Sequence, residues 1–202
     1  KIKKSIQDDV FLRSEGDEMY KRHDNKNALR ISPSRKMIAK WCEPHKSKIN
    51  KILEIGAGDG FALSYLANEL ETDAYGIEPS SEAIDKWNKI YSLNSKNSSK
   101  TILQKGVANS LPYGEDSFDM VIFGFCLYLV DRKKLFSSIA EADRVLKSGG
   151  FLVIEDFDPS KISKNKYKHL EGVYAYKQNY SEIFCASNHY SLLNKYSFTE
   201  DG

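Results

Sequence analysis

Three glycines and one acidic residue carry the most specific chemistry in this sequence. Gly56, Gly58 and Gly60 alternate directly after an apolar run, and Glu78 follows twenty residues after Gly58. A glycine-rich turn lets backbone N–H groups approach a ligand closely. A carboxylate at the end of the next strand can accept hydrogen bonds from both hydroxyls of a ribose. The spacing therefore predicts a site for an adenosine-containing ligand.

The segments on either side of these residues must position them. Residues 52–55 form a largely apolar run that predicts a buried parallel strand, and residues 74–77 predict a second one that ends at Glu78. Between them, apolar residues recur at helical spacing at Leu63, Leu66, Ala67 and Leu70. In a chain that runs from strand to glycine turn to helix to strand, the glycine turn and Glu78 lie at the same edge of the sheet.

The residue type at position 61 indicates whether the adenosine-containing ligand carries a pyrophosphate. In the dinucleotide fingerprint G-x-G-x-x-G, the third glycine allows close packing beside a pyrophosphate. Counted from Gly56, that position holds Phe61, and the third glycine stands one residue earlier. The bulky side chain disfavours a pyrophosphate, so an NAD-dependent oxidoreductase is the less favoured alternative.

With glycines at these three positions, the chain resembles the class I S-adenosylmethionine-dependent methyltransferases, whose first motif has the form E-h-G-x-G-x-G. The resemblance continues in the family's order through residues 76–80, 106–113, 117–122 and 145–150. It covers residues 50–156, about half of the chain. It implies a doubly wound α/β fold with a mostly parallel, Rossmann-like sheet and an antiparallel C-terminal edge.

The same resemblance implies S-adenosylmethionine as the cofactor and assigns roles to the matched residues. The glycine turn would pass under the methionine part and the ribose, Glu78 would bind the ribose hydroxyls, and residues 107–109 would flank the adenine. Many relatives carry Asp where Val107 stands, so a backbone group or the Asn109 amide would replace it. The implied cofactor-binding residues are Glu54, Gly56, Ala57, Gly58, Glu78, Pro79, Val107, Ala108, Asn109, Gly124 and Phe125.

The end of the fourth expected strand distinguishes subclasses of the family. Residues 124–128 read G-F-C-L-Y, which lacks the [D/N]-P-P-[Y/F] tetrad of amino-methylating enzymes. Gly124 and Phe125 offer no oxygen ligand for a metal ion. Cys126 follows Phe rather than Pro, so it is interpreted as a small core residue. The expectation is a metal-free, in-line transfer to an oxygen or nitrogen of a small or medium molecule.

Candidates for a catalytic base lie after the fifth expected strand. Asp156 and Asp158 stand at its carboxyl end, where such folds bind ligands, and His169 follows in a basic stretch. Tyr128 and Tyr180 are candidates for positioning the acceptor. The lysines of this stretch would meet a phosphate-bearing acceptor or form a solvated loop face, and both interpretations stay open.

The N-terminal 30 residues are interpreted as a helical cover, with the methyltransferase domain over residues 31–202. Residues 11–22 resemble a stretch, roughly F-L-x-x-E-G-D-x-[W/Y]-x-x-R, that precedes such domains in bacterial surface-polysaccharide synthesis. The resemblance extends the acceptor expectation to a sugar or a sugar-linked phosphate, with a role in polysaccharide biosynthesis. Tyr20 and Arg22 would then reach the cofactor pocket.

Composition excludes several other classes. The net charge of the 202 residues is only +2, which gives no field typical of a nucleic-acid partner. Three scattered cysteines favour a reducing, cytoplasmic location. The longest apolar run, residues 120–130, is shorter than the roughly 20 residues that span a bilayer, so no membrane insertion is expected. The sequence does not indicate an oligomeric state, and a non-catalytic partner subunit stays open as a second alternative.

The remaining pattern predicts the rest of the fold. Helices are expected over residues 33–46, after Ser80, from Asp131 to a stop at Gly149 and Gly150, and over residues 179–186. Further strands are expected at residues 101–106, 118–125 and 151–155. Residues 191–198 are expected to form the first arm of the antiparallel hairpin, whose second arm is not found.

Overall fold

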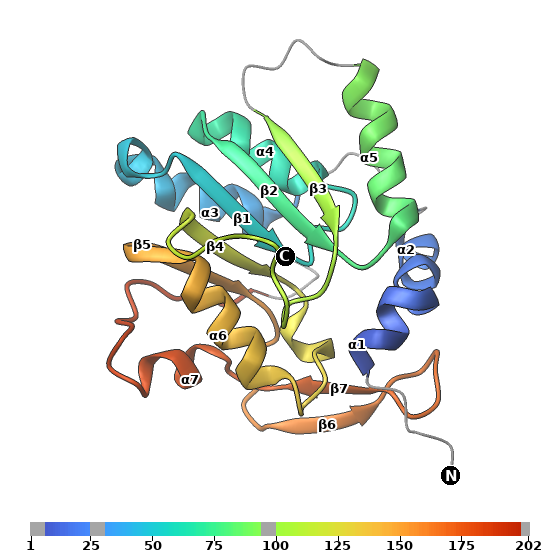
Figure 1. The fold of residues 1–202 in the computed structure, drawn as a ribbon. Coiled ribbons are helices and arrows are strands. Elements are labelled where there is room, and N and C mark those ends of the chain that lie inside the picture. The colour runs from blue at the N-terminus through green and yellow to red at the C-terminus, as the bar shows by residue number, and fades with distance from the viewer. Residues whose placement is uncertain (1–6, 25–30, 94–99, 199–202) are drawn as a thin grey trace.

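A parallel five-stranded sheet forms the centre of the molecule (Figure 1), in a computed structural model that describes residues 7–24, 31–93 and 100–198. Its strand order is β3-β2-β1-β4-β5. The strands are β1 (Lys51–Ile55), β2 (Asp73–Glu78), β3 (Thr101–Lys105), β4 (Phe118–Gly124) and β5 (Leu146–Glu155). The chain changes direction between β1 and β4, and ligands bind at such a switch point. The expected doubly wound α/β fold is confirmed.

Helices cover both faces of the sheet. α3 (Pro33–Cys42), α4 (Phe61–Leu70) and α5 (Ser81–Leu93) pack on one face, and α6 (Leu135–Val145) and α7 (Ser181–Cys185) on the other. Successive side chains along a strand point to opposite faces of the sheet, so alternate residues pack against the two helical layers. Ile52 and Ile122 face the first layer, whereas Leu53 and Phe123 face the second. The near-continuous burial of β1 and β4 follows from this double covering.

The start of α3 is determined by its own sequence. Ser32 is the N-cap, and its hydroxyl accepts a hydrogen bond from the Arg35 N–H at 3.3 Å. Pro33 occupies the first helical position, where no backbone donor is needed. The α-helix ends at Cys42 and continues as the 3-10 helix η2 (Glu43–Lys48), so the expected helix over residues 33–46 is found in two parts.

The N-terminal segment is helical and lies outside the sheet. α1 (Gln7–Val10), the π-helical η1 (Phe11–Glu15) and α2 (Gly16–Asp24) follow one another without a break. In Figure 1 the arrowheads of β2 and β3 point toward these blue helices. Residues 1–6 and 25–30 of the expected cover lie outside the described part of the chain.

The antiparallel C-terminal element differs from the one expected. β6 (Ser163–Lys166) pairs with β7 (Tyr174–Lys177) in a separate two-stranded sheet. The expectation of a strand over residues 191–198 was wrong, because the described residues there have no strand pairing and most are exposed. Sequence patterns missed β6 because it reads Ser-Lys-Asn-Lys and has no apolar alternation.

The expected limits of α6 and β5 also need correction. Lys134, not Asp131, caps α6, and the Asp131 side chain accepts backbone hydrogen bonds from Lys133 and Gln7 instead. Gly149 and Gly150 lie inside β5 and do not end a helix. Gly149 has a φ of +75°, and the two glycines lie in an irregular stretch of β5. This stretch separates the pair of Leu146 with Phe118 from the pair of Phe151 with Met120.

A small apolar cluster joins the N-terminal helices to the β6–β7 hairpin. Phe11 packs with Leu129 of η3 (Leu127–Leu129) and with Val173 and Ala175 beside and within β7. Three distant parts of the sequence therefore meet beside the carboxyl edge of the sheet. No helix in the described ranges is both long and apolar enough to cross a membrane.

Candidate cofactor and acceptor site

The glycine turn between β1 and α4 adopts backbone conformations that suit glycine. Gly56 and Gly58 have φ values of +82° and +55°. A Cβ atom on Gly56 would lie 2.8 Å from the Cβ of Cys126, so packing excludes any side chain there. A Cβ atom on Gly58 would meet nothing within 4 Å. Gly58 therefore leaves open space above the turn.

Glu78 is fixed by the turn that it faces. Its Oε2 accepts the Gly58 N–H at 2.8 Å, and its Oε1 accepts the Ser80 N–H at 2.9 Å. Burial raises the pKa of Glu78 to about 7, although the two backbone donors act in the opposite direction. A carboxylate has lone pairs beyond the two already used, so it can still accept hydroxyl donors.

A cavity of about 340 Å³ lies between this edge of the sheet and the N-terminal helices. No lysine or arginine belongs to its lining, as far as the chain is described, and the acidic residues are Asp8 and Glu78. The cavity brings together nine of the predicted cofactor residues. They are Gly56, Gly58, Glu78, Pro79, Val107, Ala108, Gly124, Phe125 and Tyr20.

Glu54 belongs to a buried ion cluster behind the cavity. Arg35 on α3 forms ion pairs with Glu54 on β1 and with Glu155 on β5, the latter with an Nε–Oε2 distance of 2.9 Å. A Cβ atom on Gly124 would overlap the Glu54 carboxylate. Glu54 therefore ties α3 to the strands, and Gly124 makes room for it. Sequence reasoning missed Arg35, since no pattern linked α3 to these two carboxylates.

Ala57 and Asn109 lie beside the cavity without lining it. Ala57 packs into the apolar layer under α4, and its N–H donates to Ile77 O at 3.2 Å. Asn109 Oδ1 is buried, and no hydrogen-bond partner for it is found in the described residues. The wall on this side consists of Gly106, Val107 and Ala108.

An aromatic group forms the other end of the cavity. The rings of Phe125, Tyr128 and Phe157 lie at centroid distances of 5.0–5.7 Å in edge-to-face contacts. Phe125 and Tyr128 line the cavity. Phe125 has a φ of +51°, a conformation that costs free energy in a residue with a side chain. Such strain is frequent at functional sites, so the aromatic end is a candidate contact for the acceptor.

Asp156 lies beside the aromatic group. Its Oδ2 accepts the Tyr128 N–H at 3.2 Å, its Oδ1 accepts the Phe157 N–H at 2.8 Å, and burial raises its pKa to about 7. It lines a different cavity, of about 560 Å³, between β5, α3 and the C-terminal segment. The exposed ring of His169 lies edge-to-face with Tyr167, at a centroid distance of 5.3 Å, and lines neither cavity.

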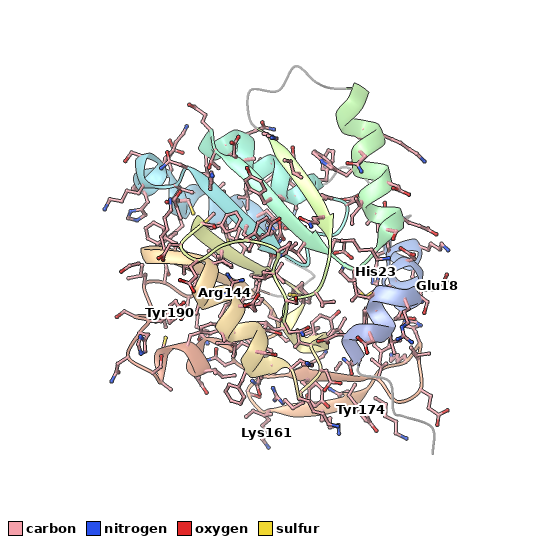
Figure 2. All side chains as sticks on the ribbon, in the orientation of Figure 1. Glu18, His23, Arg144, Lys161, Tyr174 and Tyr190 are labelled. Carbon is pink, nitrogen blue, oxygen red and sulfur yellow. The ribbon has the colours of Figure 1, made fainter. Side chains whose placement is uncertain are left out.

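The remaining basic candidates lie away from the cavity. Arg22 is paired with Glu15 and donates to the Tyr167 hydroxyl at 3.0 Å. Lys164 stacks on Tyr174, with its Nζ 4.0 Å from the ring centroid. In Figure 2, Lys161 lies at the outer edge of the molecule. His23 of α2 is the one basic side chain in the described lining of the cavity, and its Nδ1 lies 2.7 Å from the Met19 carbonyl oxygen.

Asp8 is a cavity residue that sequence reasoning missed. It lies on α1 with an exposed fraction of 8%. Its Oδ1 accepts the Asp131 N–H at 3.0 Å, and burial raises its pKa. Asp8 and Phe11 are three residues apart on the helical segment, and both line the cavity. That spacing was the only available signal, because the contact with Asp131 joins residues 123 positions apart.

Cys126 packs against the core as expected, but it is only partly buried and also lines the cavity. Its Sγ donates to the Ile55 carbonyl at 3.2 Å, and desolvation raises its pKa well above the ordinary value. In the described ranges, no three His, Cys, Asp or Glu side chains are grouped so that they could hold a metal ion.

The model of the methyltransferase domain family matches residues 53–154, which is half of the chain, and the chain belongs to that family. The match confirms the predicted class and its cofactor, S-adenosylmethionine. An uncharacterised methyltransferase from Synechocystis is 33% identical over 106 residues, which cover 52% of this chain and 46% of the relative. A fatty-acid O-methyltransferase from Mycolicibacterium smegmatis is 29% identical over 110 residues, covering 54% and 38%. The chain spans less than half of the length of either relative.

Solved structures support the fold independently. The 1,6-didemethyltoxoflavin-N1-methyltransferase of Burkholderia thailandensis superposes with a TM-score of 0.66 at 16% identity. The alignment covers 87% of this chain and 73% of that one. The PH0226 protein of Pyrococcus horikoshii gives a TM-score of 0.62 at 20% identity, covering 86% and 89%. Both alignments cover a larger share of the chain than the family model does.

Proposed function

We propose that the protein transfers a methyl group from S-adenosylmethionine to an oxygen or nitrogen of a small or medium molecule. The observation that carries the proposal is the Glu78 carboxyl, held by Gly58 and Ser80 at the wall of the cavity. When bound, the cofactor supplies an electrophilic sulfonium methyl group. The protein then has to bind, orient and exclude water, because such a transfer depends mainly on placement.

The cavity residues fit this cofactor. Glu78 retains lone pairs for two ribose hydroxyls, and the space above Gly58 is free of protein atoms. Val107 and Ala108 offer an apolar wall for a flat base. The unpartnered Asn109 Oδ1 is an acceptor next to that wall for an amino group. Phe125 and Tyr128 present aromatic faces that favour a positive sulfur.

The N-terminal helices are proposed to act as the cover of this site. Asp8, Phe11, Met19 and Tyr20 from these helices contribute to the cavity lining. Closing the site from this side would exclude water and hold the acceptor in line with the methyl group. We expect a chain lacking residues 1–24 to keep a cooperative thermal transition, to bind S-adenosylhomocysteine more weakly and to lose methyl transfer. Normal binding and turnover in that chain would contradict the role of the cover.

The cavity lining also constrains the acceptor. Because the described lining contains no lysine or arginine and only one histidine, His23, it offers an anionic group little counter-charge. The chemistry therefore favours a neutral hydroxyl or an amine, and a neutral sugar hydroxyl is compatible with it. The named relatives include an O-methyltransferase and an N1-methyltransferase, so the family relationship leaves both acceptor atoms open.

Two carboxyl groups are candidates for receiving the acceptor proton. Asp8 lines the cavity itself, and Asp156 stands behind the aromatic end with a pKa of about 7, which suits a general base. His169 was predicted for the same role, but its exposed ring contacts only Tyr167 among the described aromatic side chains. We expect Asp8→Asn or Asp156→Asn to lower turnover by about 10²-fold while cofactor affinity is kept.

The decisive experiment is calorimetry with S-adenosylhomocysteine and NAD, followed by transfer from labelled S-adenosylmethionine to a panel of acceptors. The panel should contain neutral sugars, nucleotide sugars, fatty acids and heterocyclic amines. Binding of S-adenosylhomocysteine and labelling of a neutral or amine acceptor would support the proposal. Binding of NAD alone would favour an oxidoreductase, and cofactor binding without any labelled acceptor would favour a non-catalytic subunit.

A further inference from the structure

The Glu15-Gly16-Asp17 segment docks the N-terminal helices against the residues that hold Glu78. Gly16 lies so close to the Pro79–Ser80 backbone that a Cβ atom on it would be 3.1 Å from Ser80 N and 3.2 Å from Pro79 C. Glu15 pairs with Arg22 and accepts the Tyr167 hydroxyl at 2.9 Å. One acidic residue of the segment therefore faces the hairpin, and the glycine allows close contact on the opposite side.

Asp17 completes the contact at the start of α5. Its Oδ1 accepts the Ser80 hydroxyl at 2.8 Å and the Glu82 N–H at 3.0 Å. The Ser80 hydroxyl in turn accepts the Ala83 N–H at 3.1 Å, so it acts as the N-cap of α5. Asp17 thus caps a helix that lies more than sixty residues further along the chain. Its pKa is lowered despite some desolvation, because these donors favour the charged form.

The same serine connects Asp17 to the cofactor carboxyl. Ser80 donates its hydroxyl to Asp17 and its backbone N–H to Glu78 Oε1, and Glu78 Oε2 accepts from Gly58. Asp17, Ser80, Glu78 and Gly58 therefore form one continuous chain of hydrogen bonds. It runs from the N-terminal helices to the glycine turn.

We propose that Asp17 is a positioning residue that couples docking of the N-terminal helices to cofactor binding through Ser80 and Glu78. The inference rests on the proposed function, since it assigns Glu78 to the ribose. When α2 is docked, Asp17 fixes the Ser80 turn, and the Ser80 N–H keeps the Glu78 carboxyl turned toward the cavity. By linkage, bound cofactor must stabilise the docked helix by the same factor.

The opposite end of the N-terminal segment is anchored separately, which makes this coupling specific to α2. Gln7 donates its side-chain amide to Tyr174 O at 2.8 Å and accepts the Tyr174 N–H at 3.0 Å. Its backbone N–H donates to Asp131 Oδ2 at 2.9 Å. Removal of the Asp17 carboxylate therefore leaves the start of the segment held and should change only the contact beside Glu78.

Three single variants separate this role from a general loss of structure. Asp17→Ala removes the acceptor, Asp17→Asn keeps an acceptor oxygen at the same place, and Glu18→Ala changes an exposed neighbour whose Oε1 contacts Lys21. Figure 2 shows Glu18 on the outer side of α2. By calorimetry we expect S-adenosylhomocysteine to bind about 5- to 10-fold more weakly to Asp17→Ala. Asp17→Asn and Glu18→Ala should stay within about twofold of the parent, because Asn caps helices as well as Asp.

A double-mutant cycle with Glu78→Gln decides whether Asp17 acts through Glu78. In the Glu78→Gln background, Asp17→Ala should change affinity by less than about twofold, since the positioned group has been altered. An equal loss in both backgrounds would overturn the coupling. Unchanged or tighter binding by Asp17→Ala in the parent background would also overturn the coupling. Such a result would mean that removing the negative charge of Asp17 favours binding at least as much as losing its hydrogen bonds disfavours it.

The outcomes also separate failure of the coupling from failure of the proposed function. If the parent protein binds no S-adenosylhomocysteine, the proposed function is wrong, and the proposed coupling is then wrong as well. If the parent binds and Asp17→Ala does not differ from it, only the coupling is wrong. A cooperative melt of each variant, measured by circular dichroism, shows that the compared proteins are folded.

Discussion

Two carboxyl groups, Glu78 and Asp156, end two strands of the same sheet in closely similar ways. Each follows a buried or half-buried strand, each accepts hydrogen bonds from backbone N–H groups, and burial raises the pKa of each to about 7. Only Glu78 lines the cavity beneath the N-terminal helices. The position at a strand end therefore does not by itself distinguish a carboxyl that lines the cofactor cavity from one that lies outside it.

The neighbours of the two groups account for the difference. Glu78 is surrounded by small residues, Gly58 on the turn and Gly16 on α2, which leave room for a ligand. Asp156 lies against Tyr128 and Phe157 and lines the separate cavity between β5, α3 and the C-terminal segment. Small side chains from distant segments therefore open the cofactor cavity at Glu78, and aromatic side chains stand between that cavity and Asp156.

The largest expected effect comes from breaking the buried ion cluster that ties α3 to β1 and β5. Arg35→Met would leave the buried carboxylates Glu54 and Glu155 without their partner. Removing one member of a buried pair typically costs about 3–5 kcal/mol of unfolding free energy. Urea denaturation should show this loss, with Lys36→Met on the exposed side of α3 as the matched control. A loss below about 1 kcal/mol would mean that the cluster contributes little to holding α3 against β1 and β5.

The second largest effect is expected from Glu78, and it tests only the carboxyl that lines the cofactor cavity. Glu78→Ala should weaken S-adenosylhomocysteine binding by at least about 1.5 kcal/mol, because two hydroxyls would lose a charged acceptor. Calorimetry measures the change, and Glu69→Ala on the exposed side of α4, away from the cavity lining, serves as the control. Equal affinities for Glu78→Ala and the parent would show that Glu78 does not bind the cofactor.

The raised pKa of Glu78 predicts a pH dependence of the same binding. The ionised carboxyl accepts hydroxyl donors, and it becomes protonated as the pH falls through about 7. Affinity for S-adenosylhomocysteine should therefore decrease below pH 7, by up to about tenfold per pH unit. The Glu78→Gln variant should show a flatter profile between pH 5 and pH 8. Parallel profiles for the two proteins would assign the titration to another group.

Much of the cofactor side could be predicted from the sequence because its signals are local. The glycine turn, the apolar strands and the acid after β2 lie within about thirty residues, and their spacing follows strand and helix geometry. The prediction of Gly56, Gly58 and Glu78 at one edge agrees with the structure. Metal independence remains a prediction, to be tested by transfer in the presence of EDTA.

The acceptor side depends on contacts between distant segments, which no local pattern contains. Arg22 was expected at the cofactor, yet it pairs with Glu15 and Tyr167, and Tyr167 stands 145 positions further along the chain. Asp8 was not considered because only the fold brings it to Asp131. The polar strand β6 gave no periodic signal, so the hairpin that contacts the N-terminal helices was missed as well.

The smallest expected effect on cofactor binding comes from Asp156, and it tests the contrast with Glu78 most directly. Asp156→Asn should change S-adenosylhomocysteine affinity by less than about twofold, because its side chain does not line that cavity. Besides the loss of turnover expected of a general base, the substitution should change the stability of the fold. The folded-state pKa is about 7 against an ordinary 3.8, so the folded state binds this proton more tightly than the unfolded state. The corresponding stability is fully present below about pH 4 and is lost as the pH rises through 7. Between pH 5 and pH 8, urea denaturation should therefore show the parent losing stability relative to Asp156→Asn. A tenfold loss of cofactor affinity in this variant would place Asp156 in the cofactor site and remove the distinction between the two strand ends.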